Sequence, residues 1–236
     1  MGGRLEIDDL HVTFGQAVIL QGVTLSLDRA PLSLVGRNGM GKSTLCHAIM
    51  GMVAARQGTV TLDGRPLLGL GPSRVARGGI ALVPQGRRMF PSLSVHEHLL
   101  LVAGRSKGAW TVERVYETFP RLAERRRNGG HQLSGGEQQM LAISRALLMN
   151  PRIVIMDEPS EGLAPVIVDH LIETLRAIAA EGMGVLLVEQ NMRVATSVSD
   201  QVAIMVTGRI ATTMPARELE ADRDAQRRYL GVSHGH

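Results

Sequence analysis

Cysteine, aromatic residues and long apolar runs are all scarce in this sequence of 236 residues. Its single cysteine, Cys46, allows no internal disulfide, which fits a reducing compartment. One tryptophan, two tyrosines and three phenylalanines are too few and too dispersed for a platform on which single-stranded nucleic acid stacks. Apolar runs such as Leu99 to Ala103 fall far short of the roughly 18 residues of a membrane-spanning helix. Because Met1 to Leu10 contains three acids and no long apolar core, we expect no signal or transit peptide there.

Basic residues outnumber acidic ones, and the formal net charge is +4. Apart from clusters such as Arg87 with Arg88 and Arg125 to Arg127, the arginines are scattered along the chain. Basic clusters of this size on a globular protein usually form a solvated face. We therefore expect no nucleic-acid partner.

A glycine-rich motif follows the short apolar strand predicted for Leu32 to Val35. The motif has the pattern G-x-x-x-x-G-K-S and consists of Gly36, Arg37, Asn38, Gly39, Met40, Gly41, Lys42 and Ser43. Its glycines let consecutive backbone N–H groups surround the β-phosphate of a nucleotide, while Lys42 reaches the β- and γ-phosphates. Ser43 can offer its hydroxyl to Mg²⁺, and residues 44–52 are predicted to form the helix whose positive end faces the phosphates. The motif therefore predicts nucleotide binding.

A second anion-binding helix start is predicted at Ser134. Ser134 is a good N-cap, Glu137 follows three residues later as in a capping box, and apolar residues then recur at helical spacing. The first turn contains Gly135 and Gly136, which have no Cβ to obstruct an approaching ligand. Unpaired N–H groups and the positive end of the helix dipole then favour an anion such as a terminal phosphate.

Polar side chains stand directly after two of the predicted buried strands. The apolar run Ile153 to Met156 ends in Asp157 and Glu158, and the run Ile80 to Val83 is followed by Pro84 and Gln85. In an open α/β sheet, ligands bind outside the carboxyl ends of the parallel strands. We therefore expect these polar side chains to lie near the nucleotide.

The overall pattern predicts an α/β protein with a mixed, mainly parallel sheet. Alternating residues at Arg4 to Leu10 and Val23 to Leu27 predict an N-terminal antiparallel β part, with Phe14 in the loop between the two strands. Gly86 to Gln132 has helical patterning without a strand signal, which predicts an inserted helical subdomain. Further strands are predicted at 59–62, 185–188, 202–206 and 210–213, and helices at 95–103, 112–119, 218–230 and after residue 165.

Together, these motifs resemble the ATP-binding subunit of an ATP-binding-cassette (ABC) transporter. The resemblance covers nearly the whole chain and rests on the phosphate loop, Gln85, LSGGEQ at 133–138 and the run ending in Asp157 and Glu158. LSGGEQ distinguishes ABC ATPases from phosphate-loop kinases and GTPases, because a kinase or GTPase has no use for a second anion-binding helix start. The resemblance implies a phosphate-loop NTPase fold in one ABC ATPase domain, 1–236, with an α/β core at 1–85 and 133–236 and a helical subdomain at 86–132.

The resemblance also implies ATP and Mg²⁺ as cofactors and a role for each site residue. Phe14 matches the aromatic that stacks on adenine, although a place at the edge of the core would leave the same sequence pattern. Glu158 matches the general base for the attacking water, and Gln190 and Lys42 match catalytic contacts to the phosphates. The phosphates would be held by Gly36, Arg37, Asn38, Gly39, Met40, Gly41, Lys42, Ser43 and Thr44. The residues matching the Mg²⁺ contacts are Ser43, Gln85 and Asp157.

Partners follow from the same resemblance, because Ser134, Gly135 and Gly136 match a turn that completes the ATP site of the opposite subunit. A chain with one phosphate loop and one such turn would work in a head-to-tail pair, with a related ATP-binding subunit or a second copy. Two transmembrane permease subunits would dock near Gln85 and Arg87 to Leu100, and an extracytoplasmic solute-binding protein would act indirectly. The expected location is peripheral, at the cytoplasmic face of the inner membrane.

Finer motifs narrow the resemblance to ATPases for branched-chain amino acid uptake. These motifs are GRRMFP at 86–91, SEGLAP at 160–165, VEQN at 188–191 and YLGV at 229–232. Urea-type uptake ATPases share parts of them, so urea or another small polar solute stays an alternative. ABC ATPases that act on nucleic acid or ribosomes form another alternative, but they usually have two cassettes or long coiled-coil insertions.

Two positions depart from the general ABC pattern. Gln190 stands where most members have a histidine that contacts the γ-phosphate, and Ala164 stands where many have an aspartate. An amide can donate a hydrogen bond, but unlike imidazole it takes no proton near neutral pH. Both departures resemble the branched-chain group, so we still expect ATP hydrolysis.

Overall fold

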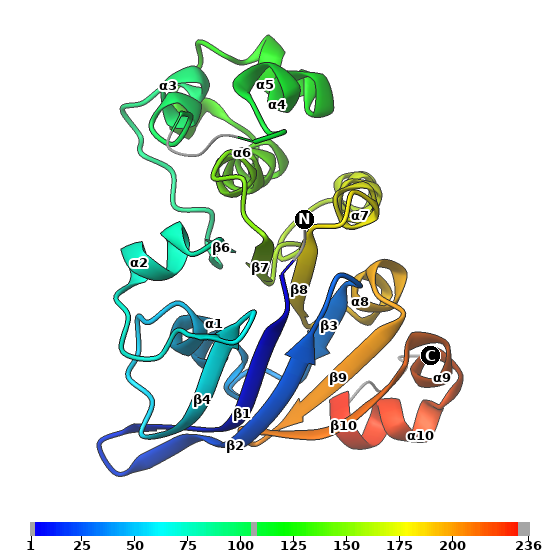
Figure 1. Ribbon diagram of the computed structural model, residues 1–236. Coiled ribbons are helices and arrows are strands. Elements are labelled where there is room, and N and C mark those ends of the chain that lie inside the picture. Colours follow the sequence, from blue (N-terminus) through cyan, green and yellow to red (C-terminus); the bar gives the residue numbers. More distant parts are fainter. Residues whose placement is uncertain (1–2, 105–107, 231–236) are drawn as a thin grey trace.

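The computed structural model describes residues 3–104 and 108–230 (Figure 1). Part of the segment between the helices predicted at 95–103 and 112–119 and the last two residues of the YLGV motif, Gly231 and Val232, lie outside these ranges. The described chain forms two sheets with helices around them, and a group of helices stands apart at the top of Figure 1.

The larger sheet has six strands in the order β10-β9-β3-β8-β7-β6. Its five parallel strands are β3 (Leu32–Val35), β6 (Ile80–Val83), β7 (Ile153–Asp157), β8 (Gly184–Glu189) and β9 (Gln201–Val206), and β10 (Arg209–Pro215) is the antiparallel edge strand. The prediction of a mixed, mainly parallel sheet is therefore confirmed. Both of its faces are covered, because Ile153 and Ile155 enter one apolar core while Val154 and Met156 enter the other.

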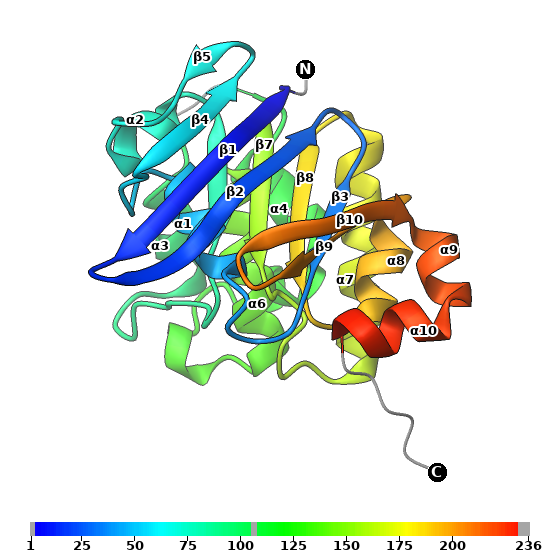
Figure 2. The ribbon, with the colours of Figure 1, turned by 90° about the horizontal axis from the view of Figure 1, so that it is seen from below.

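The smaller sheet is antiparallel, in the order β2-β1-β4-β5, and crosses in front of the larger sheet in Figure 2. Its strands are β1 (Leu5–Phe14), β2 (Ala17–Leu27), β4 (Gln57–Leu62) and β5 (Arg65–Pro66). Helix α1 (Lys42–Ile49) shares one apolar core with β1, β2 and one face of the larger sheet. This packing fixes the phosphate loop between the two sheets.

The prediction that Phe14 lies in a loop is wrong, because Phe14 is the last residue of β1 and pairs with Ala17. The connection is only Gly15 and Gln16, and Gly15 adopts φ +58°, which glycine accepts without steric cost. Both strands are longer than predicted. Three register shifts along the pair, together with Asp9 at φ +46°, interrupt the alternation of buried and exposed residues on which the prediction relied.

A group of short helices lies above α6 (Gly135–Leu147) in Figure 1. They are α3 (Val95–Leu100), α4 (Val112–Thr118), α5 (Pro120–Glu124) and a 3₁₀ turn at Gly130–Gln132. Their apolar residues share one core with α6, α7 (Pro165–Ala180) and the second face of the larger sheet. Helix α6 therefore connects the helical group to β7.

Several helices differ from what the sequence pattern predicts. Helix α2 (Pro72–Arg77), helix α5 and helix α8 (Met192–Val198) occupy segments for which no helix is predicted. The helix predicted at 218–230 is interrupted: α9 (Ala216–Ala221) ends before Asp222, and α10 (Arg223–Ala225) begins after it. Asp222 has ψ +89°, and its carboxylate accepts hydrogen bonds from the N–H groups of Asp224 and Ala225. It therefore caps a new helix where the sequence pattern predicts a continuous one.

Replacing Leu141 with alanine should destabilise the chain strongly, because this side chain is completely buried in α6 between the helical group and the sheet. The expected loss in the free energy of unfolding is about 2–5 kcal/mol. Leu100→Ala is the matched control, since Leu100 is 53% exposed, and should cost less than about 0.5 kcal/mol. Urea denaturation of both variants measures the difference, and equal losses would contradict the proposed packing of α6.

Candidate functional site

The phosphate loop connects the end of β3 to the start of α1. Gly41, the N-cap of α1, has φ +101°, and an added Cβ would lie 2.9 Å from Leu20. At Gly36 an added Cβ would lie 2.5 Å from the carbonyl oxygen of Met205. Both positions therefore require glycine, and the first N–H groups of α1 face a hollow of about 400 Å³. The hollow is lined by Ile19, Asn38, Gly39, Gly41, Lys42, Ser43, Thr44, Gln85 and Glu158.

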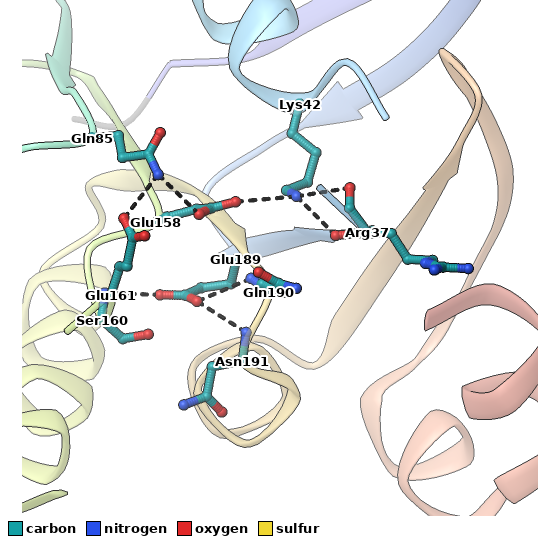
Figure 3. Close-up of polar contacts among 10 residues, drawn as sticks. Arg37, Lys42, Gln85, Glu158, Ser160, Glu161, Glu189, Gln190 and Asn191 are labelled. Carbon is teal, nitrogen blue, oxygen red and sulfur yellow. Dashed lines mark hydrogen bonds and ion pairs between the residues drawn. The ribbon is translucent and has the colours of Figure 1, made fainter. Parts of the chain in front are cut away.

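Lys42 extends along this loop with a side chain that is only 4% exposed. Its ammonium donates hydrogen bonds to the carbonyl oxygens of Gly36 at 2.8 Å and Arg37 at 3.3 Å (Figure 3). The same Nζ lies 3.1 Å from Oε1 of Glu158, whose side chain is 9% exposed. The positive charge is thus paired with the carboxylate at the end of β7.

Asp157 is the last residue of β7 and is almost completely buried. Burial raises the pKa of its carboxyl above the ordinary value of 3.8, and a hydrogen bond from Ser43 partly opposes this shift. Among the described residues, Oδ1 of Asp157 has no hydrogen-bond partner. A buried carboxylate oxygen left open beside a serine hydroxyl fits the oxygen ligands that Mg²⁺ prefers.

Glu158 follows Asp157 in a left-handed conformation, with φ +50°. Its N–H donates to the carbonyl oxygen of Val188 at 2.8 Å, so the end of β8 holds its backbone. Gln85 donates from its amide to Oε2 of Glu158 at 3.3 Å and to Oε2 of Glu161 at 2.8 Å. Sequence reasoning missed Glu161, although a third acid so soon after Asp157 and Glu158 was a signal for it.

The predicted helix start at Ser134 is confirmed. Ser134 caps α6, and its hydroxyl accepts from the N–H of Glu137 while the Glu137 carboxylate accepts from the N–H of Ser134. An added Cβ on Gly135 would lie 2.7 Å from the guanidinium of Arg87, and one on Gly136 would lie 3.0 Å from Ile167. Among the described residues that line the phosphate-loop hollow, none comes from this turn.

Gln190 and Phe14 are not among the described residues that line the phosphate-loop hollow. Gln190 is exposed and lines a second hollow, of about 410 Å³, together with Glu158 and Glu161. Phe14 is 52% exposed at the end of the β1–β2 hairpin. Glu158 thus stands between the two hollows, with Lys42 on one side and Gln190 on the other.

Arg87 connects three parts of the site that are distant in the sequence. Its guanidinium donates to the carbonyl oxygen of Glu161 at 3.0 Å and also lies against Gly135 at the start of α6. Arg87 itself has φ +60°, and the next residue, Arg88, has φ +41°. Sequence reasoning placed Arg87 only in a docking surface, because neither contact can be read from the order of the residues.

Two features are absent from the described residues. No helix within 3–104 or 108–230 is long and apolar enough to cross a membrane. The same residues contain no group of three or more histidine, cysteine, aspartate or glutamate side chains placed to hold a metal ion. Mg²⁺ that binds together with substrate phosphates usually takes only one or two carboxylates from a protein.

Comparison with known proteins agrees with this arrangement. The family model described as "ABC transporter" matches residues 20–161. The chain is 36% identical to the high-affinity branched-chain amino acid transport ATP-binding protein BraG of Pseudomonas aeruginosa, over 96% of this chain and 99% of BraG. It is 30% identical to the lipopolysaccharide export system ATP-binding protein LptB of Haemophilus influenzae, over 96% of this chain and 97% of LptB.

Solved structures show the same fold. The dimeric structure of MJ0796, described as a bacterial ABC transporter cassette, superposes with a TM-score of 0.79 at 25% identity. The match covers 90% of this chain and 99% of MJ0796. The predicted α/β class, with its antiparallel part and its helical insertion, is therefore confirmed.

Asp157→Asn should stabilise the nucleotide-free chain at neutral pH. Folding raises the pKa of Asp157, so its protonated carboxyl stabilises the folded state fully below about the ordinary pKa of 3.8. That stabilisation is lost as the pH rises through the raised pKa of the folded state. At pH 7 the ionised carboxylate is buried with an open oxygen, and asparagine removes that charge. The melting temperature should rise by about 2–4 °C.

The gain should shrink as the pH falls toward the raised pKa, because Asp157 then becomes neutral in the unmodified chain. The exposed residue Asp200 provides the control, since Asp200→Asn should change the melting temperature by less than about 1 °C. Differential scanning fluorimetry between pH 5 and pH 8 tests this, and a lower melting temperature for Asp157→Asn at pH 7 would contradict it.

Proposed function

This chain belongs to the ABC transporter family as an ATP-binding cassette with ATPase activity, and we propose that it drives the uptake of branched-chain amino acids through separate permease subunits. The convergence of Lys42 and Glu158 at the phosphate-loop hollow, beside the Asp157 carboxyl to which Ser43 is hydrogen-bonded, is the observation that carries the ATPase assignment. The likeness to BraG along almost the whole chain, together with the motifs at 86–91, 160–165 and 188–191, supports the solute.

Within this proposal, the phosphate loop from Gly36 to Thr44 holds the phosphates of ATP, and Phe14 stacks on the adenine from the end of its hairpin. The half-exposed ring of Phe14 supports this role. Ser43, Asp157 and Gln85 hold Mg²⁺, which neutralises charge on the β- and γ-phosphates when it is bound. The buried, unpartnered oxygen of Asp157 supports the metal assignment.

Glu158 is the proposed general base, and its pairing with Lys42 suggests how ATP activates it. In the structure the Lys42 ammonium contacts Glu158 and two carbonyl oxygens. Incoming phosphates carry more negative charge than one carboxylate and take over Lys42. Glu158 is then free to accept a proton from water, and Gln190 contributes only a hydrogen bond to phosphate.

The turn from Ser134 to Gly136 is proposed to bind the ATP of a second ATP-binding subunit, either a related chain or a second copy. Two observations support this: the turn is absent from the described lining of the phosphate-loop hollow, and the similar cassette MJ0796 forms a dimer. Two permease subunits and, indirectly, an extracytoplasmic solute-binding protein complete the proposed importer, at the cytoplasmic face of the inner membrane.

We propose further that 1–85 and 133–236 form the α/β core of a single ATPase domain and that 86–132 forms its helical subdomain. The segment from Arg87 to Leu100 is the proposed permease-docking surface. Phe90, Leu100 and Leu101 are large apolar side chains that are about half exposed, which supports contact with another protein.

Glu158→Gln should abolish ATP turnover while leaving ATP binding intact. An amide cannot accept the proton of the attacking water, and a positioned base usually contributes about 10²–10⁴-fold in rate. The steady-state ATPase rate of the assembled transporter is the measurement. Glu173→Gln, at an exposed position on α7, is the control and should keep the normal rate. Normal turnover by Glu158→Gln would exclude Glu158 as the base.

The solute is tested separately, with the transporter purified from membranes and placed in proteoliposomes. We expect the chain to co-purify with two permeases. In the presence of a solute-binding protein, leucine should stimulate ATP turnover and urea should not. Stimulation by urea alone would transfer the assignment to the urea alternative. A chain that purifies without permeases and is bound to RNA or DNA would contradict transport altogether.

A further inference from the structure

Glu189, the last residue of β8, is a buried acid to which the proposed reaction assigns no task. Only 2% of the residue is exposed. Its Oε1 accepts a hydrogen bond from the N–H of Ser160 at 3.0 Å, and its Oε2 accepts from the N–H groups of Gln190 and Asn191, both at 3.1 Å (Figure 3). One carboxylate thus joins two loops that are about thirty residues apart in the sequence.

These hydrogen bonds stabilise the ionised form of the buried carboxylate. Burial raises the pKa of Glu189, and hydrogen bonds from Ser160, Asn191 and Gln190 oppose that shift. A buried carboxylate that accepts several N–H groups is stabilised by their dipoles without a cationic partner. Both oxygens accept backbone N–H groups, so Glu189 is placed to hold backbone.

The backbone that Glu189 holds belongs to the acidic turn, defined as Asp157 to Glu161. Glu158 lies inside this turn at φ +50°, a conformation that is strained for a residue with a Cβ and persists only when the surrounding structure fixes it. On one side, the N–H of Glu158 itself donates to the carbonyl oxygen of Val188. On the other side, the N–H of Ser160 donates to Glu189. The end of β8 therefore fixes Glu158 from both sides.

We infer that Glu189 is a positioning residue for ATP hydrolysis, which holds Glu158 and Gln190 in one rigid unit at the end of β8. The inference rests on the proposed role of Glu158 as the base. Without the bond to Ser160, the acidic turn can relax out of its left-handed conformation, and the Glu158 carboxylate moves away from the attacking water. The two hydrogen bonds from Lys42 to the carbonyl oxygens of Gly36 and Arg37 do not pass through the Glu189 side chain.

Glu189→Asp separates the hydrogen bond to Ser160 from the hydrogen bond to Asn191. Aspartate keeps the charge and can accept from the N–H two residues further on, as in an Asx-turn, so the bond to Asn191 survives. Its side chain is one methylene shorter and cannot also reach Ser160. We expect kcat for ATP to fall about 10- to 100-fold, the size of effect that a displacement of about 1 Å produces, with KM for ATP within about twofold.

Amide hydrogen exchange in the same variant provides the second readout. Exchange at Ser160 should accelerate at least tenfold, whereas the amide of Asn191 should stay protected. Glu189→Gln is a further variant that conserves length: its single oxygen cannot serve both loops, so kcat should fall there as well. Glu173→Gln, on the exposed face of α7, is the control and should change neither kcat nor exchange.

The outcomes separate this inference from the proposed function. If Glu158→Gln keeps normal turnover, the base assignment fails, whatever Glu189 does. If Glu158→Gln is inactive but both Glu189 variants keep normal kcat, the positioning role alone is wrong. A fall in kcat with an equal rise in KM and faster exchange at both Ser160 and Asn191 would also overturn it, since that pattern shows a general loss of structure.

Discussion

The buried ion pair between Lys42 and Glu158 is the interaction on which the rest of the site depends. Removing one member would leave an uncompensated charge inside the protein, so the fold has to deliver both groups to the same point. It does so with β3 and β7, which end at the same edge of the parallel sheet on either side of β8. The phosphate loop leaves β3 there, and the acidic turn leaves β7. The same edge is where a nucleotide would meet both charges.

Helix α6 connects this edge of the sheet to the proposed second nucleotide site. It begins at the glycines after Ser134, passes through the apolar core shared with the helical group, and leads into β7 and Asp157. Arg87 adds a shorter route, since its guanidinium touches both Gly135 and the carbonyl oxygen of Glu161. A closely packed core is hardly compressible, so a helix within it moves as a rigid body and passes a displacement at one end on to the other. In the account proposed here, a partner's ATP at the start of α6 therefore affects the position of Glu158.

Local chemistry explains which features could be predicted from the sequence. The phosphate loop, the capping box at Ser134 and the buried strand before Asp157 each depend on a few adjacent residues, and each was located correctly. Phe14 was placed in a loop because bulges along β1 hide its alternation, and the break at Asp222 depends on one side chain capping its own neighbours. Glu161 and Glu189 were missed because their partners, Gln85 and Ser160, approach only after the sheet forms.

The central claim is that ATP replaces Glu158 as the partner of Lys42, while the start of α6 serves the nucleotide of the other subunit. A structure of the assembled transporter with Mg²⁺ and a non-hydrolysable ATP analogue tests both parts directly. We expect the Lys42 ammonium to contact the β- and γ-phosphates and no longer Glu158, and Ser134 and Gly136 to face the nucleotide held by the partner. An intact pair between Lys42 and Glu158, or a turn from Ser134 to Gly136 that faces its own subunit's nucleotide, would contradict this claim.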